Sequence, residues 1–105
     1  MAILQISIIP MGTKTTSVSD YIADVQDFLR ERGTPHELHD MGTIIYGNAQ
    51  DLFALAAQLH ELPFVKGSSR VVTNIVVDDR RDKEHGPGEK KASVLRILSA
   101  RDNEK

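Results

Sequence analysis

The chain has 105 residues, of which 40% are hydrophobic and 27% are charged, and its net charge at pH 7 is -2. This size fits one domain with one modest core, and the composition excludes an intrinsically disordered chain. The absence of cysteine excludes disulfides and thiolate metal ligands, and the balanced charge provides no basic stripe for nucleic acid. With no apolar run near the roughly 20 residues of a membrane span and no signal-peptide pattern, a cytoplasmic protein is expected.

The N-terminal segment, residues 2–10, is rich in β-branched side chains and is expected to form a strand that ends at Pro10. Because side chains alternate along a strand, this segment has two faces. One face carries Leu4, Ile6 and Ile8, and the other carries Ile3, Gln5, Ser7 and Ile9.

A helix is expected to follow, with Ser17 or Ser19 as its N-cap and Gly33 as its end. Two short extended segments, 36–40 and 43–46, then flank Met41-Gly42, which we expect to be a two-residue hairpin turn. The apolar residues of the helix have the spacing of one buried stripe, which comprises Val18, Tyr21, Ile22, Val25, Phe28 and Leu29.

The second half of the chain predicts another helix, the clearest strand and a terminal helix. The helix covers about residues 49–62, with Asn48 as its cap and Pro63 as its stop. The strand is Arg70–Asp78, and the charged run from Asp78 to Lys83 is expected to form salt bridges at its end. A charged loop at 79–88 and a C-terminal helix at 89–100 complete the chain.

The order β-α-β-β-α-β plus a terminal helix predicts one ferredoxin-like α+β domain over residues 1–105. The expected antiparallel sheet has the order 4-1-3-2, with both helices on one face. The opposite face is then open, and Ile3 and Ile9 make it too apolar for a fully wetted surface. We therefore expect a homo-oligomer in which another subunit covers this face.

The tripeptide Met-Gly-Thr occurs twice, at residues 11–13 and 41–43. In the expected topology both copies lie at the same end of neighbouring strands. The hydroxyls of Thr13 and Thr43, the glycine amides and the two methionines would then line a small concavity suited to a polar heteroaromatic ligand. The alternative is two tight turns that share letters, with methionine in the core.

A second polar set is expected on the open face of the sheet. Gln5 and Ser7 share that face of the first strand, and Asn74 joins them if the residues on either side of it in the last strand pack on the helices. Polar groups beneath an oligomer interface must find hydrogen bonds, either with one another or with a ligand.

Metal binding, RNA binding and catalysis have less support. His36 and His39 would lie on opposite faces of a strand, and His60 and His85 are far from them in sequence, so no metal site is expected. RNA-binding modules with this order of elements need strand aromatics, and the strands here carry only Tyr46. An isomerase or oxygenase would use Glu37, His39 and Asp40 as acid–base groups, and a ligand-free structural or regulatory oligomer is the remaining alternative.

Three segments, ISIIPMGT, ELHDMGTIIYG and RVVTNIVVDDRRDK, resemble in order and spacing those of the small ferredoxin-like thiamine-binding proteins, long catalogued as an uncharacterised protein family. The matching positions are Pro10 to Thr13, Met41 to Thr43 and Asp78 to Lys83. The resemblance implies a sheet-packed dimer, often paired into a tetramer. It also implies binding of thiamine or its hydroxymethylpyrimidine moiety, with no catalysis and no required cofactor.

Two positions depart from the pattern of that family. Asp40 stands where the family often has proline, and Tyr46 stands where it often has glutamate. Thiamine carries a permanent positive charge, which favours a carboxylate or an aromatic face nearby. The expected ligand contacts are therefore hydrogen bonds from Gln5, Ser7, Thr13, Thr43 and Asn74, packing by Met11 and Met41, the amides of Gly12 and Gly42, and cation contacts from Glu37, Asp40 and Tyr46.

Overall fold

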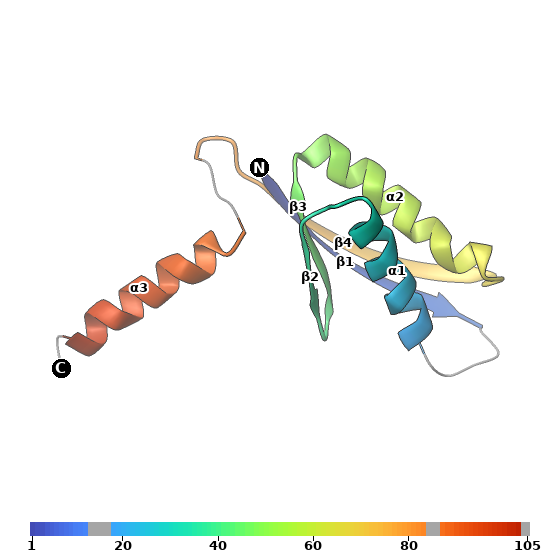
Figure 1. Cartoon of the computed structure of the whole chain (residues 1–105), viewed down its shortest axis with the longest axis horizontal. Coiled ribbons are helices and arrows are strands. Elements are labelled where there is room, and N and C mark those ends of the chain that lie inside the picture. Colours follow the sequence, from blue (N-terminus) through green and yellow to red (C-terminus); the bar gives the residue numbers. More distant parts are fainter. Residues whose placement is uncertain (13–17, 84–86, 104–105) are drawn as a thin grey trace.

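Within the described residues, the elements follow one another in the order β-α-β-β-α-β-α, as expected from the sequence. The computed structural model describes residues 1–12, 18–83 and 87–103, so the predicted roles of Thr13, Ser17 and His85 lie outside the described residues. The elements, drawn in Figure 1, are β1 (Ala2–Met11), α1 (Ser19–Glu31), β2 (His36–His39), β3 (Gly42–Gly47), α2 (Ala49–Val65), β4 (Arg70–Asp79) and α3 (Glu89–Asn103).

The four strands form an antiparallel sheet in the order β2-β3-β1-β4, which confirms the predicted topology. β1 pairs with β3 from Ala2 to Ile6 and with β4 along its whole length, from Ala2 to Met11. Within the described residues, β4 alone therefore pairs with residues 7–11 of β1. We call these residues the β1 extension, and they position the candidate site.

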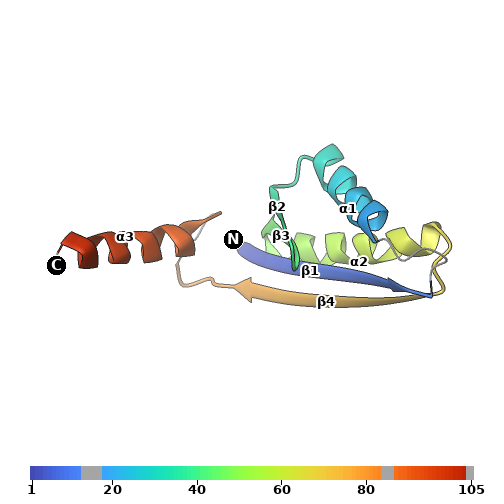
Figure 2. The same cartoon turned by 90° about the horizontal axis from the view of Figure 1, so that it is seen from below.

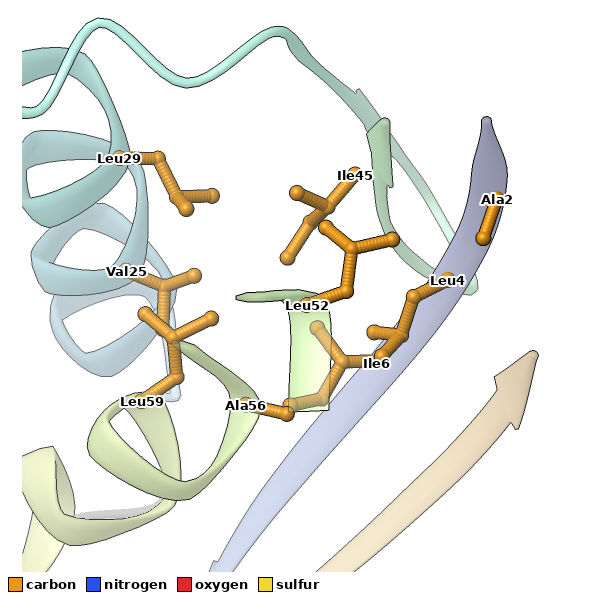
Figure 3. Packing of buried hydrophobic residues seen from close by; sticks show 9 residues of the cluster. All are labelled: Ala2, Leu4, Ile6, Val25, Leu29, Ile45, Leu52, Ala56 and Leu59. Carbon is orange, nitrogen blue, oxygen red and sulfur yellow. The ribbon is translucent and has the colours of Figure 1, made fainter. Parts of the chain in front are cut away.

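Helices α1 and α2 lie on the same side of the sheet (Figure 2). Between these helices and the sheet is the core, in which Leu4, Leu29, Ile45 and Leu59 are fully buried. Figure 3 shows side chains from α1, α2, β1 and β3 pointing toward one another across this layer. The buried cluster comprises Ala2, Leu4, Ile6, Val25, Leu29, Ile45, Leu52, Ala56 and Leu59.

Both prolines predicted to end an element lie inside one. β1 passes through Pro10 to Met11, because the β1 extension has an unpaired edge and a residue without an N–H is tolerated there. Helix α2 runs past Pro63 to Val65, and because only two residues follow the proline, any kink it causes affects only the last turn. The Pro63 carbonyl then accepts hydrogen bonds from the amides of Lys66 and Ser68 and closes the helix.

Two predicted turn and cap positions shift by one residue. The hairpin turn is Asp40-Met41 rather than Met41-Gly42, because Gly42 already pairs with His39 as the first residue of β3. The N-cap of α1 is Val18, with Ser19 as the first helical residue, so the predicted cap at Ser19 is wrong. The Asn48 cap of α2 is confirmed, since its side chain accepts a hydrogen bond from the amide of Asp51.

The charged run after β4 forms ion pairs, as expected. Asp79 binds Arg81 at 2.8 Å and Asp82 binds Arg80 at 2.8 Å. The hydrogen bond from Arg81 holds the pKa of Asp79 below its ordinary value, and Arg80 has the same effect on the pKa of Asp82. Because these pairs are exposed, each contributes little to stability.

The last helix stands away from the rest of the molecule, as both views show (Figures 1 and 2). Lys90 near its start forms an ion pair with Asp78 at the end of β4. Helix α3 continues to Asn103, beyond the predicted end at residue 100, and none of its residues is buried. None of the helices in the described part of the chain is long and apolar enough to cross a bilayer.

Candidate functional site

A pocket of about 220 Å³ lies between the first turns of α1, the β2–β3 hairpin and the β1 extension. We call it the hairpin pocket. Its walls are mainly apolar, and its polar side chains come mostly from the hairpin, with Ser7 of β1 and Tyr21 of α1 in addition. The lining residues are Ile6, Ser7, Ile8, Ile9, Val18, Tyr21, Ile22, Val25, Leu38, His39, Asp40, Met41, Gly42 and Thr43.

The short hairpin explains why this space exists. β3 begins at Gly42, and its pairing with β1 stops at Ile6, so no strand lies beside β1 beyond that point in the described chain. The first turns of α1 therefore lack a sheet surface beneath them. Val18 and Ile22 are 41% and 39% exposed and line the pocket, although the helical pattern predicts them in the buried stripe.

The edge of the β1 extension offers main-chain hydrogen-bonding groups to the pocket. The Ile6 carbonyl points toward β3, since a Cβ added at Gly42 would lie 2.9 Å from that oxygen. In an antiparallel strand, residues two apart direct their N–H and C=O groups to the same side. The N–H and C=O of Ile8 therefore face the hairpin side, where no strand of the described chain pairs with them.

Thr43 forms the polar floor of the pocket. Its side chain is on the helix side of the sheet, opposite Ile6, and the residue is only 4% exposed. Its hydroxyl oxygen accepts a hydrogen bond of 2.9 Å from the Gln26 side-chain amide of α1. The hydroxyl proton of Thr43 remains available to donate, so the pair can present a donor to a ligand.

The hairpin turn supplies the charge at the mouth of the pocket. Asp40 lines the pocket and is exposed, and Met41 beside it is 83% exposed. His39 also lines the pocket, and its Nε2 lies 3.1 Å from the Glu37 carboxylate. Both partners of that pair are about half exposed, so solvent screens them and the arrangement lacks the enclosure of an acid–base catalytic pair.

The second Met-Gly-Thr segment lines the pocket, whereas Met11 and Gly12 of the first segment are not among the described residues that line it. Met41, Gly42 and Thr43 are lining residues, together with Ser7 and Asp40. Met11 pairs with Arg70, five residues beyond Ile6 along β1, which is about 17 Å at the rise of an extended strand. In the described part of the first segment, Met11 and Gly12 therefore lie away from this pocket, and the nearest atom to a Cβ added at Gly12 is the Ser69 hydroxyl. The expected contact of Thr13 lies outside the described residues and stays a prediction.

The other predicted residues gather on the open face of the sheet. Ser7 pairs directly with Asn74, so these two side chains share that face, as the sequence pattern predicts. Gln5 pairs with Ile44, and Ile44 pairs with Glu37, which places Gln5 and Glu37 on the same face. Of this polar set, Ser7 alone also lines the hairpin pocket.

Tyr46 lies near the end of β3, beside the start of β1, and it does not line the pocket. It pairs with Ile3, is 7% exposed, and its amide donates to the Pro35 carbonyl. Burial raises the pKa of its phenol, and the nearby Glu37 carboxylate adds to that rise. The aromatic residue that lines the pocket is Tyr21 of α1.

Most of the apolar lining was not predicted from the sequence, as Tyr21, Ile22 and Leu38 illustrate, and Gln26 beside Thr43 was missed as well. Tyr21 and Ile22 carry the helical spacing of core residues, and only the position of β3 along β1 shows that they face a cavity. Gln26 sits beside that stripe without any motif, and its role depends on contact with Thr43. Leu38 alternates with Glu37 and His39 in β2, and this alternation was the available signal.

Lys66 lies beside Tyr21 of the pocket wall. Its ammonium lies 5.4 Å from the centre of the Tyr21 ring and 2.7 Å from the Asp24 carboxylate. The hydrogen bond to Asp24 raises the pKa of Lys66. Among the residues that the structure describes, no group of three or more histidines or acids could hold a metal ion.

The family model described as thiamine-binding protein matches residues 4–95. A UPF0045 protein of Staphylococcus xylosus is 46% identical over 103 residues, covering 94% of this chain and 96% of that relative. The crystal structure of a hypothetical protein of Methanocaldococcus jannaschii has a TM-score of 0.77 and 27% identity, over 89% of this chain and 94% of that one.

A third similar protein is known from its crystal structure in Thermotoga maritima, and its name refers to thiamine biosynthesis and salvage. It has a TM-score of 0.72 and 14% identity, covering 89% of this chain and 97% of that one. At this identity the likeness concerns the fold alone. It supports the ferredoxin-like α+β architecture built above.

Proposed function

Because the chain belongs to the thiamine-binding protein family, we propose that it binds thiamine, or the hydroxymethylpyrimidine moiety of thiamine, in the hairpin pocket. The chemistry of the pocket supports this assignment. It combines apolar walls with a few polar groups, which is the usual composition of a site for a small heteroaromatic molecule. The salvage-related name of the Thermotoga maritima protein is consistent with such a ligand.

The observation that carries the proposal is the unpaired edge at Ile8. An aminopyrimidine presents an amino donor beside a ring-nitrogen acceptor, and the C=O and N–H of one strand residue present the complementary pair. Ile8 lines the pocket with both groups directed to the hairpin side. The pyrimidine would lie along this edge, against Ile22 and Leu38, with the Thr43 hydroxyl as a further donor.

The positively charged part of thiamine would lie at the mouth of the pocket beside Asp40. A carboxylate there attracts the thiazolium ring, which replaces the cation contact first expected of Tyr46. The Tyr21 ring already lies near Lys66 and serves as an apolar wall. The Asp40 departure from the family pattern would thus strengthen cation binding in this chain.

The proposed role is binding without chemical change, with no cofactor required. Equilibrium dialysis of the protein against thiamine, followed by mass analysis of the retained ligand, tests both parts. Retention of unaltered thiamine is the expected result. Equal thiamine concentrations on the two sides of the dialysis membrane would contradict binding. A retained product of different mass would contradict the non-catalytic role and would favour an enzyme that uses Glu37, His39 and Asp40.

Replacing Thr43 by valine should weaken thiamine binding by about tenfold, which corresponds to about 1.4 kcal/mol. The variant keeps the shape of the side chain but removes the hydroxyl that holds Gln26 and faces the pocket. Calorimetric titration measures the affinity, and the melting temperature reports the fold. Thr43→Ser, which keeps the hydroxyl, is the matched control, and unchanged affinity in the valine variant removes Thr43 from the site.

We further propose that a second copy of the chain covers the open face of the sheet. Ile9, Val72 and Val76 on that face are 42%, 37% and 65% exposed, and they flank the polar group of Gln5, Ser7 and Asn74. A two-fold pairing would place the polar groups of both copies together and satisfy them mutually. Such a dimer would lie next to the hairpin pocket through Ser7, which belongs to both surfaces.

A further inference from the structure

The hydroxyl of Thr43 is held by a contact that crosses from the sheet to a helix. Thr43 is the second residue of β3, and Gln26 lies near the middle of α1. The Nε2 atom of Gln26 donates to the Oγ1 atom of Thr43 at 2.9 Å, and the pair is partly buried. Thr43 lines the hairpin pocket, whereas Gln26 is not among the described residues that line it. Gln26 therefore acts on the pocket through Thr43, as a positioning residue.

This hydrogen bond fixes what the Thr43 hydroxyl can offer to a ligand. A hydroxyl has one proton and two lone pairs. Because Gln26 donates to one lone pair, the proton of Thr43 must point away from that amide, toward a different acceptor. Within the described chain the structure gives the Thr43 side chain no second partner, and the residue is only 4% exposed. A ligand atom that accepts a hydrogen bond would therefore satisfy a donor that has little contact with bulk water.

An aminopyrimidine has such an acceptor left over. Its ring contains two nitrogens, and the proposed contact with the Ile8 edge uses the one beside the amino group. The other ring nitrogen, opposite the amino group, carries a lone pair and no proton, so it needs a donor when it leaves water. In a uracil-type pyrimidine this ring nitrogen carries a proton instead. Two donors would then face each other at Thr43, and both would stay unpaired.

We propose that Gln26 determines the specificity of the hairpin pocket. Because it fixes Thr43 as a donor, the pocket selects an aminopyrimidine, whose free ring nitrogen accepts, over a uracil-type pyrimidine, whose ring N–H donates. This inference rests on the proposed function, since it names the property by which the proposed thiamine site recognises the pyrimidine ring. Its tests therefore measure both affinity and selectivity.

The substitution Gln26→Glu reverses the hydrogen bond with almost no change in shape. A carboxylate only accepts, so the Thr43 hydroxyl must donate to it and present a lone pair to the pocket. Thiamine affinity, measured by calorimetric titration, is expected to fall about tenfold. The added negative charge would by itself favour the thiazolium cation, so the charge does not explain a loss. Gln50→Glu is the matched control: it makes the same change at an exposed residue of α2 outside the hairpin pocket and should keep full affinity.

A second background separates this role from general support of the fold. In Thr43→Val the hydroxyl is absent, so adding Gln26→Glu should cause no further loss of thiamine affinity. If Gln26 only supported the packing of α1 on the sheet, the loss would be the same with and without the hydroxyl. An equal loss in the two backgrounds therefore overturns the inference, and the melting temperature of each variant reports whether it is folded.

The selectivity itself is measured with two uncharged probes. These are hydroxymethylpyrimidine and hydroxymethyluracil, which carries a proton on each ring nitrogen. The wild type should bind hydroxymethylpyrimidine at least about tenfold more tightly, and Gln26→Glu should lower this ratio while Gln50→Glu keeps it. An unchanged ratio in Gln26→Glu overturns the inference and leaves the proposed function standing. A wild type that binds neither thiamine nor hydroxymethylpyrimidine overturns the proposed function, and this inference with it.

Discussion

Replacing Ile22 by tryptophan is expected to weaken thiamine binding by about 100-fold or more, equivalent to about 2.7 kcal/mol. Ile22 lines the hairpin pocket from α1 and is 39% exposed, so the larger ring would project into the space that the ligand needs. The pocket holds only about 220 Å³, and an indole would occupy a large part of it. The core beneath Val25 and Leu29 would be left intact, so the melting temperature should change little.

Ala23 provides the matched control for this variant. It is the next residue of α1, is exposed and does not line the pocket. Ala23→Trp adds an indole to the same helix and should leave the affinity unchanged. If calorimetry finds full affinity in Ile22→Trp, or an equal loss in both variants, the ligand does not occupy the hairpin pocket.

Replacing Gly42 by alanine is expected to lower both stability and affinity. The added Cβ would lie 2.9 Å from the Ile6 carbonyl oxygen, and because this neighbour is backbone, the hairpin must shift. We expect a loss of about 1–3 kcal/mol in the free energy of unfolding, the range seen when a packed interior is overfilled. Asp40, Met41 and Thr43 would move with the hairpin, so thiamine affinity should fall as well.

The control for this substitution is Gly33→Ala. Gly33 lies in the turn between α1 and β2, and a Cβ added there has no atom within 4 Å, although its φ of +67° makes alanine strained. That variant should lose about 1 kcal/mol of stability and keep full affinity. Denaturant unfolding measures the stability of both variants, and calorimetric titration measures their thiamine affinity. A Gly42→Ala protein with wild-type affinity would show that the hairpin does not shape the site.

The sheet and its helices could be predicted from the sequence because their patterns are local. Alternation along residues 2–10 assigned Leu4 and Ile6 to the core, and the helical spacing assigned Val25 and Leu29, all of which are buried. The chain order then left few topologies, and the observed strand order is among the simplest. The predicted ends of β1 at Pro10 and of α2 at Pro63 were wrong. The free-energy cost of a proline depends on whether a neighbouring strand or helix turn needs the missing N–H.

The candidate site could be predicted only in part because it depends on strand register. The repeated Met-Gly-Thr predicted Met41, Gly42 and Thr43 as site residues, and all three line the hairpin pocket. The pairing of Ile6 with Thr43 determines how many residues of β1 extend beyond the end of β3. This register cannot be predicted from the pattern of residues within either strand. Because of this register, Met11 lies away from the pocket and the edge of β1 at Ile8 is unpaired in the described chain. For the same reason, Ile22 lines the pocket instead of packing in the core.

Calorimetric titration of the wild-type protein with thiamine tests the central claim most directly, with hydroxymethylpyrimidine and thiamine diphosphate as comparisons. The account predicts saturable binding of thiamine at about one site per subunit, because the residues that line the pocket come from a single chain. Hydroxymethylpyrimidine should bind more weakly, since it lacks the cation that faces Asp40. An absence of heat with all three compounds at concentrations up to about 1 mM, where even a weak site would be occupied, would contradict the account.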